Sequence, residues 1–424
     1  MTQHIPWTRR SFIQRGTVFA SLAGTAPLFL QQTAEGAATP LGALTSSIPG
    51  MAQERIFVVV QLGGGNDGLN TIVPHGMDQY YRSRPSLGIG RPGTTGGALA
   101  SGVRGAEGLG FNPEFEGFKA LMDDARAAVI QGVGYPNPNR SHFSSMDIWH
   151  SANPNGKTEG WLGRYFDNTC KGAPDPQAAI AIGKTAPPAL QGRRTRAVSF
   201  SKPELYRWTG EDIDDDLKNA YKTVTGDPDK ANDTLAFLRR TAMDAQISSA
   251  KVRDAARLAP LATFPGGNLS DQLRMVAAMI RSNLPTRVYY VTLGGFDTHA
   301  NQAGQHGRLL RQVGDSLKAF SDDLKAQGND GRVLTMVFSE FGRRVAQNGS
   351  GGTDHGTAAP LYLIGPMVQP GFFGQHPSLS SLDGGDLKYT TDFRQVYASV
   401  LEDWLKTDST AVLRSRFKKL NVLS

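Results

Sequence analysis

The chain alternates short apolar runs with stretches in which apolar residues recur every three or four positions. Apolar runs of strand length lie at 56–62, 127–134, 179–183, 288–295, 333–340 and 360–366. The first, IFVVVQL, is apolar at nearly every position, as is typical of a strand buried on both faces. Helical spacing marks 112–125, 233–258, 269–282 and 305–328. This alternation predicts an α/β fold with a mostly parallel central sheet flanked by helices.

The domain organisation follows from the same pattern. The chain has 424 residues, which by length alone could make two domains. We expect one α/β domain over 41–424, because strand and helix signals alternate through most of that range. Segment 205–265 has much helical pattern and little strand pattern. We therefore expect it to be a helical insertion on the sheet.

The first 40 residues have the order of an export signal. Arg9 and Arg10 precede Phe12, a mildly apolar run covers 16–30, and small residues follow at 34–38. The apolar run is too short to span a bilayer as a mature helix. The paired arginines are typical of Tat signals, whereas an ordinary Sec signal or an uncleaved anchor is the alternative. We expect the Tat translocase as an export partner, a periplasmic or secreted location, and no stable membrane span in the mature form.

Charge and cysteine content narrow the classes of partner and site. The formal net charge is +7, and without the first 40 residues it falls to +5. The basic residues are dispersed, and neither zinc-finger spacing nor an RNP-like motif is present, which argues against a nucleic-acid partner. A single cysteine, Cys170, allows no internal disulfide and no thiolate zinc site. Any metal site must use carboxylates, imidazoles or hydroxyls.

Acidic residues and histidines follow several of the predicted strands. In an open parallel sheet, ligands bind beyond the carboxyl ends of the strands, so these side chains should meet at one edge. Together they suit one or two divalent metal ions, namely Zn, Mn, Ca or Mg, and two such ions can clamp a reacting phosphoryl group. The predicted metal ligands are Asp67, Asp297, His299, Glu340, Asp354 and His355.

Each of these residues also has a plain structural alternative. Asp67 stands in an Asn-Asp-Gly sequence that suits a turn. Glu340 could pair with Arg343 or Arg344 close by in the chain. Asp354 stands near glycines, where a backbone-capping role is common, and the Asp297–His299 pair could be a loop carboxylate and a surface imidazole.

The segment NPNRSHFSSMDIWHS (137–151) supplies three candidate catalytic residues. It follows a predicted strand and favours a helix that starts near Ser141. A hydroxyl there would feel the positive end of the helix dipole, Arg140 could hold an oxyanion, and His142 could be a ligand or a proton donor. The alternative is that Ser141 is a helix N-cap and nothing more.

Six longer segments read QLGGGNDGLNTIVP, NRSHFSSMDIWHS, GWLGRY, GGFDTHANQ, SEFGRRVAQNGSGGTDHGTAAPLYLIG and TDFRQVYASVLEDWL. They resemble the bacterial proteins grouped as domain of unknown function 1501, over nearly the whole chain after the signal. Members look like Tat-exported proteins and are related in fold to the alkaline phosphatase and sulfatase superfamily. The resemblance therefore implies an alkaline-phosphatase-like fold.

The resemblance also implies roles for site residues. Members of the superfamily have an Asp after the first strand, a nucleophile at a helix start, and Asp and His ligands after later strands. Asp67 matches the first-strand Asp, and Ser141 is the best match to the nucleophile. Asp297 and His299 match the middle pair, but one residue separates them where such phosphatases often have three, and Asn301 holds the expected position.

Two later positions, Glu340 and His355, differ in how well they match the superfamily pattern. Glu340 stands at a strand end where the superfamily usually has Asp-His, and His355 matches a late His before a Pro-led strand. With these residues, the sequence favours a metal-dependent hydrolase of phosphate or sulfate esters, acting on a small-molecule or glycan substrate. The competing hypothesis is a non-catalytic secreted protein that binds a metal, a glycan or a cell-surface partner on the same scaffold.

Overall fold

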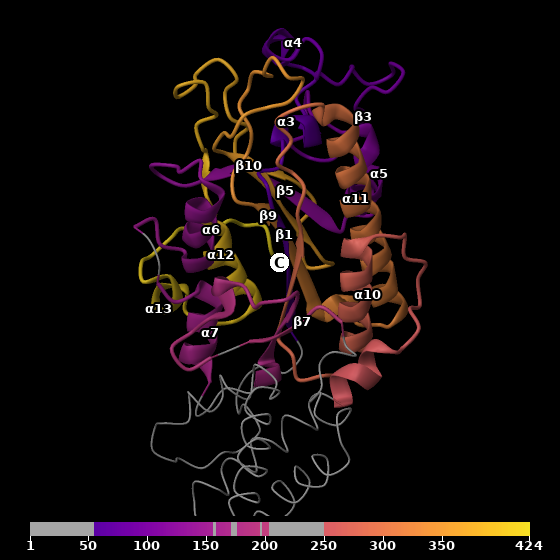
Figure 1. Ribbon diagram of the computed structural model, residues 1–424, viewed down its shortest axis with the longest axis vertical. Helices are drawn as coiled ribbons and strands as arrows, with labels where there is room; N and C mark the ends of the chain where they lie inside the picture. Colours follow the sequence, from indigo (N-terminus) through magenta and orange to yellow (C-terminus); the bar gives the residue numbers. More distant parts are fainter. Residues whose placement is uncertain (1–54, 156–157, 171–175, 196, 203–249) are drawn as a thin grey trace, which may run out of the picture. The chain divides into compact units, whose positions relative to one another are not determined.

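The computed structural model describes residues 55–155, 158–170, 176–195, 197–202 and 250–424 (Figure 1). Its contacts divide the chain into two compact units, Met1–Leu44 with Phe200–Arg257 and Thr45–Ser199 with Leu258–Ser424. The predicted signal segment and most of the predicted insertion at 205–265 lie outside the described residues. The domain assignment therefore stays a prediction.

A nine-stranded sheet dominates the described residues, with the order β11-β5-β10-β9-β1-β8-β6-β7 and with β12 paired to β5. Each predicted strand is present, and the ends differ by two residues at most. The strands are β1 (Ile56–Leu62), β5 (Ala127–Gly134), β6 (Ala179–Ile182), β7 (Val198–Phe200), β8 (Val288–Leu293), β9 (Val333–Ser339), β10 (Ala359–Ile364), β11 (Gly371–Phe373) and β12 (Thr391–Asp392).

Strand direction decides which loops meet. β1 pairs in parallel with both β8 and β9, and β6 pairs in parallel with β8. β10 is antiparallel to its neighbours β5 and β9. The carboxyl ends of β1, β5, β8 and β9 therefore share one edge with the amino end of β10. The expected α/β fold with a mostly parallel sheet is confirmed.

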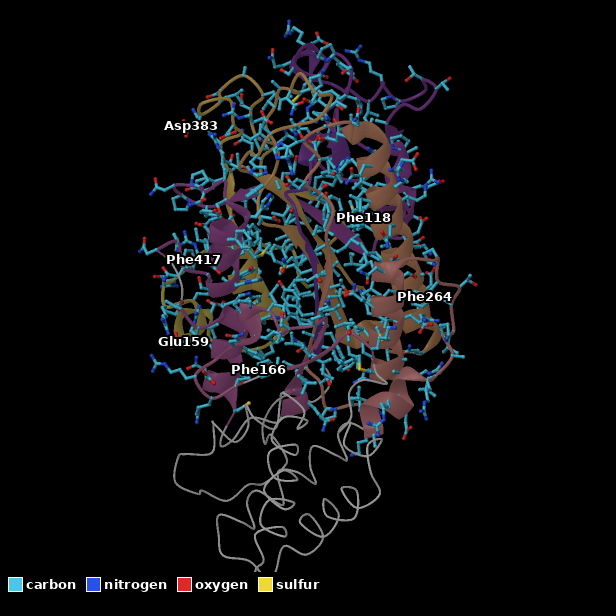
Figure 2. All side chains as sticks on the ribbon, viewed as in Figure 1. Phe118, Glu159, Phe166, Phe264, Asp383 and Phe417 are labelled. Carbon is cyan, nitrogen blue, oxygen red and sulfur yellow. The ribbon has the colours of Figure 1, made fainter. Side chains whose placement is uncertain are left out.

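Helices cover both faces of this sheet (Figure 1). On one side lie α5 (Glu116–Asp123), α10 (Asn268–Arg281) and α11 (Gln302–Ala326), and on the other lie α6 (His142–Ser151), α7 (Trp161–Thr169), α12 (Phe393–Ser399) and α13 (Ser409–Leu413). Phe118 of α5 and Phe166 of α7 mark the two sides in Figure 2. Two covered faces explain why the strands are apolar at consecutive positions.

The β1 strand illustrates the packing. All its residues except Gln61 are buried. Successive side chains point to opposite faces, and Phe57 packs edge-on against Trp161 of α7 with ring centroids 6.0 Å apart. Phe57 and Val59 belong to a core that includes Trp149, Trp161 and other residues of the α6, α7 and α12 side.

The predicted helix at 391–405 begins at α12 with a capping box. The Asp392 side chain accepts from the backbone N–H of Arg394, and the Gln395 side chain accepts from the N–H of Asp392. The last turns, Val400–Trp404, are π-helical. Shorter helices α3 (Gly68–Thr71) and α4 (Asp78–Ser83) follow β1, beside a three-stranded sheet of β2 (Ile72–Val73), β3 (Leu99–Ala100) and β4 (Gly110–Phe111).

Candidate metal centre

The candidate site is built by loops at the shared edge of the sheet. The loop after β8 carries Asp297 and His299, and the loop between β9 and β10 carries Glu340, Asp354 and His355. The loop after β5 leads into α6, whose first residue is His142. These residues come from segments far apart in the chain, and the strand directions in the sheet bring them to the same edge.

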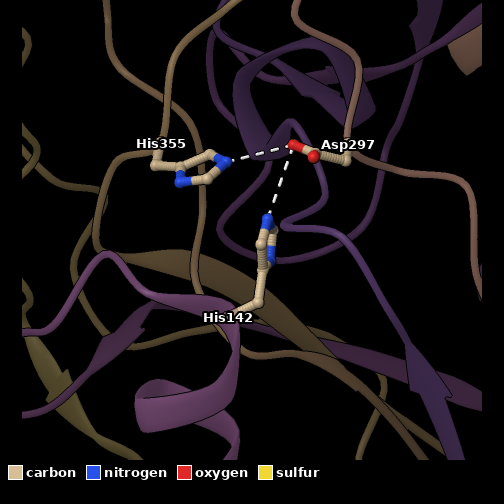
Figure 3. Close-up of side chains that lie close together, drawn as sticks. All are labelled: His142, Asp297 and His355. Carbon is tan, nitrogen blue, oxygen red and sulfur yellow. Dashed lines mark hydrogen bonds and ion pairs between the residues drawn. The ribbon is translucent and has the colours of Figure 1, made fainter.

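The side chains converge on one carboxylate oxygen (Figure 3). Asp297 Oδ1 lies 3.0 Å from His355 Nε2 and 3.5 Å from His142 Nε2, as the dashed lines in Figure 3 show. The same oxygen lies 3.1 Å from His299 Nε2. His142, Asp297 and His355 each offer one ligand atom, and the three atoms lie within 4.8 Å of one another. Three imidazole nitrogens around one carboxylate oxygen are a donor set that suits a transition metal ion.

The other nitrogen of each ring faces an oxygen atom. His142 Nδ1 lies 2.7 Å from Glu340 Oε1, His299 Nδ1 lies 3.2 Å from Asp354 Oδ1, and His355 Nδ1 lies 2.9 Å from the carbonyl oxygen of Arg140. A carbonyl or an ionised carboxylate only accepts hydrogen bonds, so each Nδ1 carries the proton. In the neutral ring, Nε2 then has a lone pair, as a metal ligand requires.

His142 shows this orientation most directly. Its Nε2 is buried and has no hydrogen-bond partner, although it points at the cluster. The ring packs against Phe341 at 4.9 Å and against His355 at 4.4 Å between ring centroids. Phe341 also lies 5.0 Å from His355, so one buried aromatic ring supports two of the imidazoles.

Arg343 fixes the carboxylate at the centre. Burial of Asp297 raises the pKa of its carboxyl, but the hydrogen bond and charge of Arg343 together with the neighbouring imidazoles of His355 and His142 outweigh this and bring the pKa to about 2. The buried Arg343 donates to Asp297 Oδ1 at 2.7 Å and to backbone oxygens of Gly64, Gly65, Phe296 and Thr353. One guanidinium thus joins the loops that follow β1, β8 and β9, and the Asp297 side chain remains 49% exposed.

Glu340 and Asp354 have different positions from those expected of metal ligands. Glu340 is buried and accepts from the Gly64 N–H at 2.8 Å as well as facing His142. Asp354 is exposed and accepts from Asn348, which with other polar contacts lowers the pKa of its carboxyl. Both carboxylates lie behind a histidine, where they orient the ring. Glu340 does not pair with Arg343, whose partner is Asp297.

Asp67 is placed away from the cluster, contrary to our expectation of a metal ligand. It is fully buried and forms an ion pair with Arg84 at 2.6 Å. It also caps α3 by accepting from the Asn70 N–H, and it accepts from Gln302. Burial raises the pKa of this carboxyl, but Arg84, His306 and Gln302 together outweigh this effect, so the pKa is lower than the usual value for Asp. These contacts occupy both carboxylate oxygens and give Asp67 a structural role.

Ser141 and Arg140 lie beside the histidines. Ser141 is the N-cap residue of α6, is exposed, and makes no capping hydrogen bond with its side chain. The Arg140 carbonyl oxygen accepts a hydrogen bond from His355 Nδ1. The Arg140 guanidinium pairs with the buried Asp386 at 2.5 Å. Any oxyanion that Arg140 bound would therefore have to compete with Asp386 for the guanidinium.

The sequence predicts His142 to be a ligand or a proton donor, and the structure places it among the candidate ligands. For Arg343 the sequence indicates only a possible pairing with Glu340, and it misses the contact with Asp297. Its burial could not be read from a pair of adjacent arginines, since nothing in Arg343–Arg344 distinguishes the buried side chain from the exposed one.

A family model matches residues 125–404, which include every candidate ligand at this edge. Its description is "Protein of unknown function (DUF1501)". The chain belongs to the DUF1501 family. This confirms the resemblance found in the sequence, and the family description assigns no activity. No curated protein matches this DUF1501 chain.

Solved structures that align with this DUF1501 chain are distant. The C-terminal periplasmic domain of EcEptC from Escherichia coli, in complex with Zn, is 10% identical over 88% of this chain and 94% of that chain, with a TM-score of 0.40. The PsFucS1 sulfatase from Pseudoalteromonas sp. is 9% identical over 87% and 72%, with a TM-score of 0.38. Alkaline phosphatase from the Antarctic bacterium TAB5 is 13% identical over 74% and 93%, with a TM-score of 0.31.

Two of these structures are of a sulfatase and an alkaline phosphatase, and similarity at TM-scores of this size assigns no activity to this chain. Nor does any helix among the described residues have the length and apolar character needed to cross a bilayer.

Proposed function

We propose that this chain is an exported metal-dependent hydrolase of phosphate or sulfate esters. The observation that carries the proposal is the arrangement around Asp297 Oδ1, where three imidazole Nε2 atoms lie within 3.5 Å. Each ring is oriented by an oxygen acceptor at Nδ1. A hydrogen-bond acceptor at the second ring nitrogen is typical of histidines that bind a metal.

The donor set favours zinc or a similar transition metal over calcium or magnesium. Imidazole is a common ligand of zinc, whereas calcium and magnesium prefer oxygen ligands. His142, Asp297 and His355 would hold the ion and leave a position for substrate, and His299 lies beside them, 3.1 Å from Asp297 Oδ1. A bound metal ion would supply positive charge against the negative charge that develops on the ester oxygens.

The exposure of Asp297 supports a catalytic site more than a structural one. Structural zinc sites are closed by four protein ligands, whereas catalytic sites keep a position open to substrate. Half of the Asp297 side chain is exposed, so a small ester can reach the cluster from solvent.

Ser141 is the proposed nucleophile. Arg140 contacts His355 through its carbonyl, and His142 belongs to the cluster, so the residue between them lies at the edge of the site. The Ser141 hydroxyl does not cap α6, which leaves it available at the positive end of the helix dipole. Arg140 would bind the substrate's non-bridging oxygens in competition with Asp386.

Substrate class and location rest on the sequence. The resemblance to the alkaline phosphatase and sulfatase superfamily favours phosphate or sulfate esters, and the paired Arg9 and Arg10 favour Tat export to the periplasm or beyond. The alternative function is a secreted metal- or glycan-binding protein without turnover. The ion pair of Arg140 with Asp386 would suit this alternative, because it engages the arginine that would otherwise hold the substrate's oxygens.

An ester screen separates these functions. Purified protein loaded with zinc or manganese would be assayed against aryl phosphate and aryl sulfate esters, beside Ser141→Ala and Ser144→Ala. We expect turnover that is lost in Ser141→Ala and kept in the neighbouring serine variant. Metal binding without turnover of any ester would favour the binding protein. Equal turnover by Ser141→Ala would remove that serine from the mechanism.

A further inference from the structure

Gln302 is a buried amide that contacts both ligand-bearing loops. It is the first residue of α11, and none of its surface is exposed. Its Oε1 accepts from Thr298 Oγ1 at 3.1 Å and from Thr353 Oγ1 at 2.6 Å. Both threonines are buried as well, so water does not compete for these hydrogen bonds.

The two threonines are adjacent to the site. Thr298 stands between Asp297 and His299, and Thr353 precedes Asp354 and His355. The Thr353 N–H also donates to the Thr298 carbonyl at 3.3 Å. If either threonine shifts, the backbone of the candidate ligand next to it has to shift as well.

The hydrogen bonds of Asp67 and Arg84 set the orientation of the Gln302 amide. Gln302 Nε2 donates to Asp67 Oδ2 at 2.5 Å, and Arg84 donates to the same oxygen at 2.6 Å. A carboxylate only accepts hydrogen bonds, so the NH₂ group must face Asp67 and the carbonyl must face the threonines. Arg84 is anchored in turn by backbone oxygens of Arg344 and Val345.

We propose that Gln302 is a positioning residue, which fixes the loops of Thr298 and Thr353 against each other and thereby sets the metal affinity of the Asp297 cluster. This inference rests on the metal site of the proposed function. It also gives a role to Asp67 and Arg84, which hold the amide from the side away from the site.

Zinc affinity measured by calorimetry tests this role. Gln302→Leu and Thr353→Val should each bind zinc about 10- to 100-fold more weakly than the wild type, as is common when a residue that keeps metal ligands in position is replaced. Thr353→Ser keeps the hydroxyl and should bind within about threefold of the wild type, by the same reasoning. The matched control is Gln272→Leu, because Gln272 is a buried amide that bonds Asn268 and Thr292 instead.

The outcomes are distinguishable. Wild-type affinity in both Gln302→Leu and Thr353→Val would overturn this inference and leave the metal site intact. An equal loss in Gln272→Leu would also overturn it, because the effect would then be one of general stability. If the wild type itself binds no zinc, the metal site fails, and the positioning role fails with it. Thr353→Val keeps the test valid if Gln302→Leu does not fold.

Discussion

His299 and His355 face each other with their Nε2 atoms 2.9 Å apart. Each ring has its Nδ1 against an oxygen acceptor, which leaves two lone pairs pointing at each other in the neutral form. Two acceptor atoms this close repel unless a cation lies between them. That cation is either a proton on one ring or a metal ion, and the nearby Asp297 Oδ1 strengthens the attraction for both.

Glu340 should matter for metal affinity although it is not placed as a ligand. Glu340→Ala removes the acceptor that holds the His142 ring and leaves Nδ1 and the Gly64 N–H without it. We expect zinc affinity to fall about 10- to 100-fold, measured by calorimetry. Glu116→Ala, on the exposed first turn of α5, is the control and should bind zinc normally. Normal binding by Glu340→Ala would show that His142 needs no orienting partner.

Arg343 should be far more important for stability than its neighbour. Arg343→Met leaves the buried backbone oxygens of Gly65 and Thr353 without their donor. At about 1–3 kcal/mol for each orphaned group, we expect a loss of at least about 2 kcal/mol in urea unfolding.

The control for this loss is Arg344→Met. The Arg344 side chain is 37% exposed and lies 3.7 Å from Asp386, so its replacement should change the free energy of unfolding by less than about 1 kcal/mol. Similar losses in the two variants would contradict the assignment of Arg343 as the residue that joins the loops.

Two buried histidines predict a pH dependence of stability. Burial lowers the pKa of His150 and of His306 from 6.5 to about 4. Between these values the unfolded chain binds more protons than the folded chain, so stability falls as the pH is lowered. The contribution of these two residues is lost progressively from about pH 6.5 and is fully lost below about pH 4.

Replacing one histidine isolates its share of this effect. His150, on α6, lies 3.2 Å from Gln61 Oε1 of β1 and 3.3 Å from the Tyr290 hydroxyl of β8. His150→Gln cannot titrate, so its urea midpoint should change less between pH 7 and pH 5 than that of the wild type. An identical slope in the two proteins would mean that His150 titrates alike in the folded and unfolded chains.

The sheet could be predicted closely because its signal is local. Runs such as IFVVVQL are apolar at consecutive positions, and the structure buries β1 on both faces as that pattern requires. The edge at which ligands gather also followed from strand direction. The antiparallel direction of β10 was not evident, because an apolar run carries no sign of which way its neighbours point.

The composition of the site was harder to predict, because ligand and supporting residue look alike in a sequence. Asp67 and Asp297 both follow buried strands, but the first meets Arg84 from a helix 17 positions on and the second meets imidazoles. Glu340 lies at the expected strand end, yet it faces the Nδ1 side of His142. Such differences depend on side-chain direction in loops, which residue spacing does not fix.

The most direct test of the account is the metal content of the purified protein beside Asp297→Ala. Elemental analysis after growth in zinc- and manganese-supplemented medium should find near-stoichiometric metal in the wild type and little in the variant, because Asp297 Oδ1 is the atom that all three histidines share. A folded wild type that carries no metal and takes up none on dialysis would contradict the metal centre and the hydrolase proposed from it.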